Sequence, residues 1–76
     1  MNDYTIEVAT AFDTHDEFYD AVAIVRWQGT ENSEFCQQLV TRKWTTPLQR
    51  SRDLRRAISY ALTEAALAFE RGDIDP

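Results

Sequence analysis

Alternating apolar and polar residues open the chain. Residues 4–12, YTIEVATAF, alternate with a period of two, which predicts a β-strand. One face of this strand carries Tyr4, Ile6, Val8 and Phe12. After a polar break, residues 18–27, FYDAVAIVRW, are rich in β-branched and aromatic side chains and are apolar on both faces. That pattern is typical of a strand in the middle of a sheet.

A third strand and a helix follow. The third strand is predicted over residues 34–44, EFCQQLVTRKW, after the turn-like segment QGTENS. Short connections between successive strands favour an antiparallel meander. The helix is predicted from apolar residues at steps of three and four, which are Leu54, Ile58, Ala61, Leu62, Ala65 and Phe69. Ser51 is the preferred N-cap, the alternative is a start at Pro47 capped by Thr46, and Gly72 is placed to end the helix.

These elements predict one small α+β domain over residues 1–76, a three-stranded antiparallel β-meander followed by one C-terminal α-helix packed on one sheet face. The apolar residues suggest a register for the first hairpin. The predicted pairs are Phe12 with Phe18, Val8 with Val22, and Ile6 with Ile24. This face would then be the core under the helix.

The second hairpin is aligned on the same face. Pairing Val22 with Val40 places Trp44 opposite Phe18 and turns Cys36 inward. It also sets Asp20 against Arg42, an opposite-charge pair.

The other sheet face is then left uncovered, although it is apolar and aromatic. Its predicted interface residues are Tyr19, Val25, Trp27, Phe35 and Leu39. Tyr60 and Leu67 form a smaller patch on the helix, unless they are two scattered surface residues. An apolar surface of this kind is typical of an interface, so we expect a homodimer or a complex with another protein. In the alternative, the true strand register differs by one residue from the predicted one, and the sheet residues of this set belong to the core.

Charge is segregated along the chain. Residues 42–56 contain six basic residues and one acid, a net charge of +5, which leaves −10 for the rest of a chain whose total is −5. The basic set is Arg42, Lys43, Arg50, Arg52, Arg55 and Arg56, and the first hairpin loop carries Asp13, Asp16, Glu17 and Asp20. In a meander the two clusters become neighbours, so the arginines are expected to neutralise the loop. The functional alternative is a nucleic-acid contact by the arginines.

A three-stranded sheet followed by a helix with a basic start resembles the second half of a double-stranded RNA-binding domain. The helix that precedes the sheet in that family and its lysine-rich run are missing, and Asp53 stands among the arginines. We therefore carry over none of its binding residues, and the acidic total charge makes general nucleic-acid binding an unfavoured alternative.

Catalytic and metal-binding patterns are absent from the sequence. The single histidine, His15, lies in a short acidic loop, DTHDE, whose spacing matches neither calcium loops nor zinc motifs. The two glycines, Gly29 and Gly72, are far apart, so no phosphate-binding loop exists. Cys36 is expected to be a small core residue. We expect no enzyme activity, no metal and no cofactor.

Size and composition narrow the function class. The 76 residues include one cysteine and no run long enough to span a membrane, which favours a cytoplasmic protein. In size, charge and layout the chain resembles small acidic phage-encoded inhibitors of host defence such as the anti-CRISPR proteins. The resemblance implies a protein-interaction module that binds or blocks a nucleic-acid-handling or defence complex, with the acidic residues 13, 16, 17 and 20 imitating phosphates. The alternative is a nucleic-acid-binding or regulatory protein that uses the arginine cluster.

Overall fold

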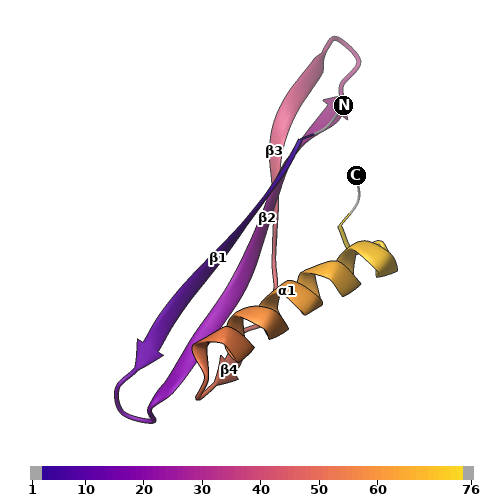
Figure 1. Cartoon of the computed structure of the whole chain (residues 1–76). Coiled ribbons are helices and arrows are strands. Elements are labelled where there is room, and N and C mark those ends of the chain that lie inside the picture. The colour runs from indigo at the N-terminus through magenta and orange to yellow at the C-terminus, as the bar shows by residue number, and fades with distance from the viewer. Residues whose placement is uncertain (1–2, 75–76) are drawn as a thin grey trace.

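The computed structural model describes residues 3–74 and consists of two layers, an antiparallel sheet and one helix (Figure 1). The elements are β1 (Tyr4–Asp13), β2 (Phe18–Asn32), β3 (Gln37–Thr45), β4 (Gln49–Ser51) and α1 (Leu54–Arg71). In the sheet β2 lies between β1 and β3, and β4 pairs with the first part of β2. The predicted α+β fold, an antiparallel three-stranded sheet followed by a C-terminal helix, is confirmed, with β4 as an addition.

The ends of α1 are set by one side chain and one glycine. Asp53 has extended backbone geometry, and its carboxylate accepts a hydrogen bond from the backbone N–H of Arg55 at 3.0 Å. Ser51, the predicted cap, instead ends β4, and its hydroxyl accepts from the N–H of Asp53. Gly72 has φ 80°, the left-handed conformation expected of a residue that ends a helix, so its predicted role is confirmed.

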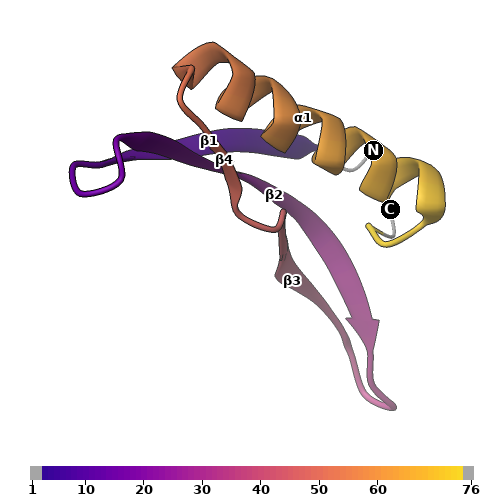
Figure 2. The same ribbon diagram turned by 90° about the horizontal axis from the view of Figure 1, so that it is seen from below.

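The molecule is long for its size. Its extents are 53 × 23 × 16 Å and its radius of gyration is 15.5 Å, whereas a compact domain of this length has a radius of about 11 Å. The cause is β2, which continues through most of the segment predicted as a turn and ends only at Asn32. Figure 2 shows the β2–β3 hairpin extending away from the helix.

The core between the layers is lined mostly by alanine. Its buried residues are Ala21, Ala23, Val25 and Trp27 of β2, Ala57, Ala61, Ala65 and Ala68 of α1, and Ile74. Small side chains on both elements let the helix lie close to β2. Of the predicted helix stripe, Ala61 and Ala65 are buried, whereas Leu54 and Leu62 are exposed. The buried stripe is therefore rotated relative to the predicted one.

The predicted register of the first hairpin is wrong by one residue. Val8 pairs with Ala23 and Ile6 with Val25, because the ladder closes with Asp13 opposite Phe18. The face predicted for β1 is correct, since Tyr4 and Val8 pack against the core. The face of β2 is inverted, because a one-residue slip turns every side chain to the other side.

The second hairpin also differs from the prediction. Val40 pairs with Gly29 and Trp44 with Val25, so both lie on the helix side of the sheet, as predicted, but opposite other partners. The cause is again the length of β2, which moves the turn to Ser33–Cys36. Cys36 is exposed in that turn, not turned inward.

Candidate functional site

The acidic loop between β1 and β2 is held by one arginine. Arg50, on β4, donates from Nε to Asp20 at 2.8 Å and from a terminal nitrogen to Asp13 at 3.1 Å. The nitrogen–oxygen distance from Arg50 to Asp16 is 3.5 Å. The interpretation that arginine neutralises this loop is thus confirmed for Arg50. The partner predicted for Asp20, Arg42, is wrong, because β4 and not β3 lies beside Asp20.

Local hydrogen bonds also shape this loop. The carboxylate of Asp13 accepts from the backbone N–H groups of His15 at 2.9 Å and Asp16 at 3.2 Å. These two bonds, and then the charge of Arg50, hold the pKa of Asp13 below its ordinary value, while partial burial opposes the change. The pKa of Arg50 is raised, chiefly by its hydrogen bond to Asp20. Glu17 closes the loop with φ 59°.

The basic residues do not form one surface. Arg50 and Arg52 lie over the ring of Phe18, with guanidinium-to-centroid distances of 5.5 and 5.3 Å. Arg42 pairs with Trp27 on the helix side of the sheet, whereas Lys43 pairs with Arg26 on the other side. The remaining two, Arg55 and Arg56, are exposed in the first turn of α1. The cluster predicted as a nucleic-acid contact is thus divided among several surfaces.

The predicted protein interface is also divided. Val25 and Trp27 are 0% and 7% exposed, because the inverted face of β2 puts them under α1. Tyr19 packs against the core and its ring centroid lies 4.8 Å from that of Phe12. The assignment of these three residues to an uncovered face is therefore wrong. Tyr60 and Leu67 are exposed on the helix, as predicted.

The two most exposed of the large apolar side chains lie on the β2–β3 hairpin. Phe35 is 93% exposed and Leu39 is 77% exposed. The turn that carries Phe35 is ordered by Ser33, whose backbone N–H donates to the carbonyl of Cys36 at 2.9 Å and whose hydroxyl accepts from the N–H of Cys36 at 3.1 Å. The hairpin therefore displays an aromatic side chain on a defined turn at one end of the molecule.

Sequence analysis missed two exposed residues of β1. Ile6 and Phe12 lie on its helix-side face and are each 50% exposed. The sequence predicts both as core residues, because the alternation of β1 gives their face correctly but not the width of the helix layer. The narrow helix layer could have been predicted from the alanines of the helix. Ala57, Ala61, Ala65 and Ala68 lie at steps of three and four, which is typical of a narrow, close helix–sheet contact.

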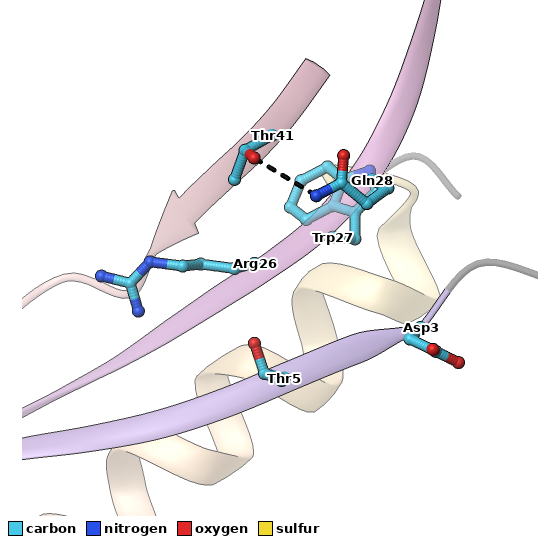
Figure 3. A pocket seen from close by; sticks show the side chains of 6 residues that line it. All are labelled: Asp3, Thr5, Arg26, Trp27, Gln28 and Thr41. Atoms are coloured by element: carbon cyan, nitrogen blue, oxygen red, sulfur yellow. Dashed lines mark hydrogen bonds between the residues drawn. The ribbon is translucent and has the colours of Figure 1, made fainter. Parts of the chain in front are cut away.

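A shallow pocket of about 310 Å³ lies on the sheet face away from the helix (Figure 3). It is lined by Asp3, Thr5, Arg26, Trp27, Gln28 and Thr41. The amide of Gln28 donates to the hydroxyl of Thr41 at 3.3 Å, and Arg26 is paired with Glu7 at 2.7 Å. Within this lining Gln28 and Thr41 therefore bond each other, whereas Arg26 is held by Glu7 from outside the pocket.

The described residues were also compared with what a metal site and a membrane-spanning helix require. Over residues 3–74 no group of three or more His, Cys, Asp or Glu side chains is arranged to hold a metal ion. Within the same range, α1 does not have the length and apolar character needed to cross a membrane.

Comparison of the chain with protein-family models, with curated proteins and with solved structures gives no match. The functional argument therefore depends on the surfaces described above.

Proposed function

We propose that the protein is a non-enzymatic protein-interaction module that presents the β2–β3 hairpin to a partner protein. The observation that carries this proposal is the exposure of Phe35 and Leu39 on a hairpin that extends from the helix layer (Figure 2). Large aromatic and aliphatic side chains at the centre of a contact supply most of the binding energy in protein interfaces. An ordered turn also reduces the entropy lost on binding.

The charge around this hairpin favours a basic partner. Glu31 lies near the end of β2 and Glu34 lies in the turn, and from Gly29 to Thr41 the sequence has no Lys or Arg. An apolar tip with an acidic rim complements an apolar pocket with a basic rim. In line with the resemblance to phage-encoded inhibitors, we propose that the partner is a basic component of a nucleic-acid-handling or defence complex, which the protein binds and blocks.

The acidic loop at the other end of β2 is a weaker candidate for this role. Three of its carboxylates, those of Asp13, Asp16 and Asp20, already face Arg50. A phosphate mimic needs carboxylates that are free to meet the cations of a partner. We therefore propose the hairpin as the contact. We also propose that the protein acts in the reducing cytoplasm, where the exposed thiol of Cys36 would remain reduced.

Affinity capture from a lysate of the host cells tests the proposal. Immobilised wild-type protein is compared with Phe35→Ser, and Tyr60→Ser is the matched control because it removes an exposed aromatic group from the helix. We expect wild type and Tyr60→Ser to capture the same protein, and Phe35→Ser to lose it while keeping the wild-type circular dichroism spectrum. Capture should also weaken as salt rises.

Two outcomes would contradict this assignment. If Phe35→Ser captures the same protein as wild type, the hairpin is not the contact. If capture is lost only when Asp13, Asp16 and Asp20 are changed together to Asn, the acidic loop is the contact. A mobility shift with duplex RNA or DNA at low salt would instead support the nucleic-acid alternative.

A further inference from the structure

The outer edge of β1 is open along its whole length. Among the residues that the structure describes, no strand lies on the side of β1 away from β2. Its ten residues pair with β2 without interruption, so no bulge twists this edge away. Its sequence, YTIEVATAFD, contains no Lys, Arg or Pro. Natural edge strands commonly carry basic residues, proline or a bulge, which hinder pairing with other chains. The opposite edge strand, β3, does carry Arg42 and Lys43.

An apolar strip accompanies this edge. Ile6 and Phe12 are half exposed on the helix-side face of β1. On α1, Phe69 packs edge-on against Tyr4 of β1, with ring centroids 5.5 Å apart. Leu62 lies two helical turns before Phe69 on the same flank of α1. Like Ile6 and Phe12, it is exposed. The open backbone edge therefore runs beside apolar side chains from both layers.

We infer that β1 pairs with β1 of a second copy of this chain, in an antiparallel homodimer whose two-fold axis passes at Ala9. The sheet would then continue from one copy into the next, with both helices on the same face. In this register Ile6 lies opposite Phe12 of the second copy, so the two half-exposed apolar residues of β1 cover each other. Glu7 lies opposite Ala11, which leaves no like charges face to face.

The charges of β1 select this register. Shifting one strand by two residues keeps both helices on one face. In one direction that shift sets Asp3 against Asp13 of the second copy, and in the other it sets Glu7 against Asp13. A further shift in the first direction sets Glu7 against Glu7, and one in the second direction leaves only residues 9–13 of β1 paired. Like charges directly opposite each other destabilise a strand pair.

The contact fits a weak, reversible dimer. Ten residues span about 33 Å, and the edge of a single sheet layer is about 10 Å high. The sheet edge of each copy therefore contributes about 330 Å², or about 660 Å² in total, and Leu62 and Phe69 of α1 add to this area, which is typical of weak and transient interfaces. Because the strands are antiparallel, the two β2–β3 hairpins point to opposite ends of the dimer and stay free.

Sedimentation equilibrium of the full chain in the presence of a reductant tests the dimer. The reductant excludes a disulfide through Cys36. Over about 1 μM to 1 mM protein we expect the mass to rise from 8.8 kDa to about twice that value. Ile6→Lys and Phe12→Glu, each at a half-exposed site, should keep the fold and raise the dissociation constant by about 100-fold or more, because each sets a charge against an apolar side chain.

A double variant tests the register itself. In Ile6→Lys/Phe12→Glu the introduced charges face each other across the two-fold axis, so dimerisation should recover toward the wild-type value. Leu39→Lys, on the hairpin, is the matched control and should dimerise like wild type. A wild-type protein that stays at 8.8 kDa throughout, or single variants that still dimerise, would overturn the inference. Open-ended assembly would overturn it as well, since a two-fold contact closes at two copies. None of these outcomes depends on binding by Phe35.

Discussion

Two adjacent residues of β2 provide the sharpest test of which sheet face the helix covers. Val25 is fully buried under α1, whereas Ile24 is half-buried on the face away from it. Changing either residue to Thr keeps a β-branched side chain in the strand, so the intrinsic strand preference is nearly unchanged. The two variants therefore differ mainly in where the new hydroxyl lies.

The expected difference follows from burial. At Val25 the hydroxyl enters a cluster made of Ala21, Ala23, Trp27 and the alanines of α1, and an unpaired buried hydroxyl costs about 1–3 kcal/mol. At Ile24 water reaches the hydroxyl, so the cost should stay below about 1 kcal/mol. A domain of this size has a total stability of about 4–11 kcal/mol, so both variants should fold.

Thermal and urea unfolding followed by circular dichroism measure this difference. Each kcal/mol lowers the Tm of a domain of this size by about 4–8 °C, so Val25→Thr should melt at least about 4 °C below wild type. The urea m-value should stay constant if both variants unfold in two states. A larger loss for Ile24→Thr than for Val25→Thr would refute the face assignment, and with it the correction to the register of β2.

Two further predictions concern buried and charged hydrogen bonds. Thr46→Val removes the buried hydroxyl that accepts the N–H of Ala23 at 2.8 Å, so unfolding in urea should show a loss of about 1–3 kcal/mol, and Thr46→Ser should recover most of it. The lowered pKa of Asp13 stabilises the fold above the unfolded-state pKa of about 3.9, and this contribution is lost as pH falls through the folded-state pKa. Asp13→Asn keeps an oxygen for the N–H groups of His15 and Asp16, so its urea midpoint should fall less than that of wild type below about pH 4. Equal losses for both proteins would contradict the assigned role of this carboxylate.

Much of the fold could be predicted because each element has a clear local pattern. The period-two alternation of β1 assigned Tyr4 and Val8 to the correct face, and Gly72 marked the end of the helix. The face of β2 could not be predicted in the same way, because both of its faces are apolar. Val22 and Ile24 are predicted as core because their side chains are the larger ones. In the structure the helix packs instead on the smaller residues Ala21 and Ala23.

The register depended on turns whose sequences give weak signals. The loop before β2 places Glu17 at φ 59°, a conformation usually signalled by Gly or Asn, and its N–H bonds to the carbonyl of Asp13 at 2.8 Å. At the other end Gly29, in the segment predicted as a turn, lies inside β2, where a Cβ would collide with the side chain of Arg42. The candidate sites therefore changed with the register. Phe35 and Leu39 remained exposed, and Val25 and Trp27 became core.

The alanine-lined core links the fold to both proposed contacts. An alanine buries less apolar area than a leucine, so this helix–sheet contact contributes less hydrophobic stabilisation than a leucine-rich one of equal length. Several larger apolar residues, among them Ile6, Phe12 and Leu62, lie at its margin and remain exposed. A 76-residue chain has little surplus stability to lose in this way. Because a partner that binds only the folded state stabilises it, contacts at the β1 edge and at the hairpin would supply stability that the core of a single copy lacks.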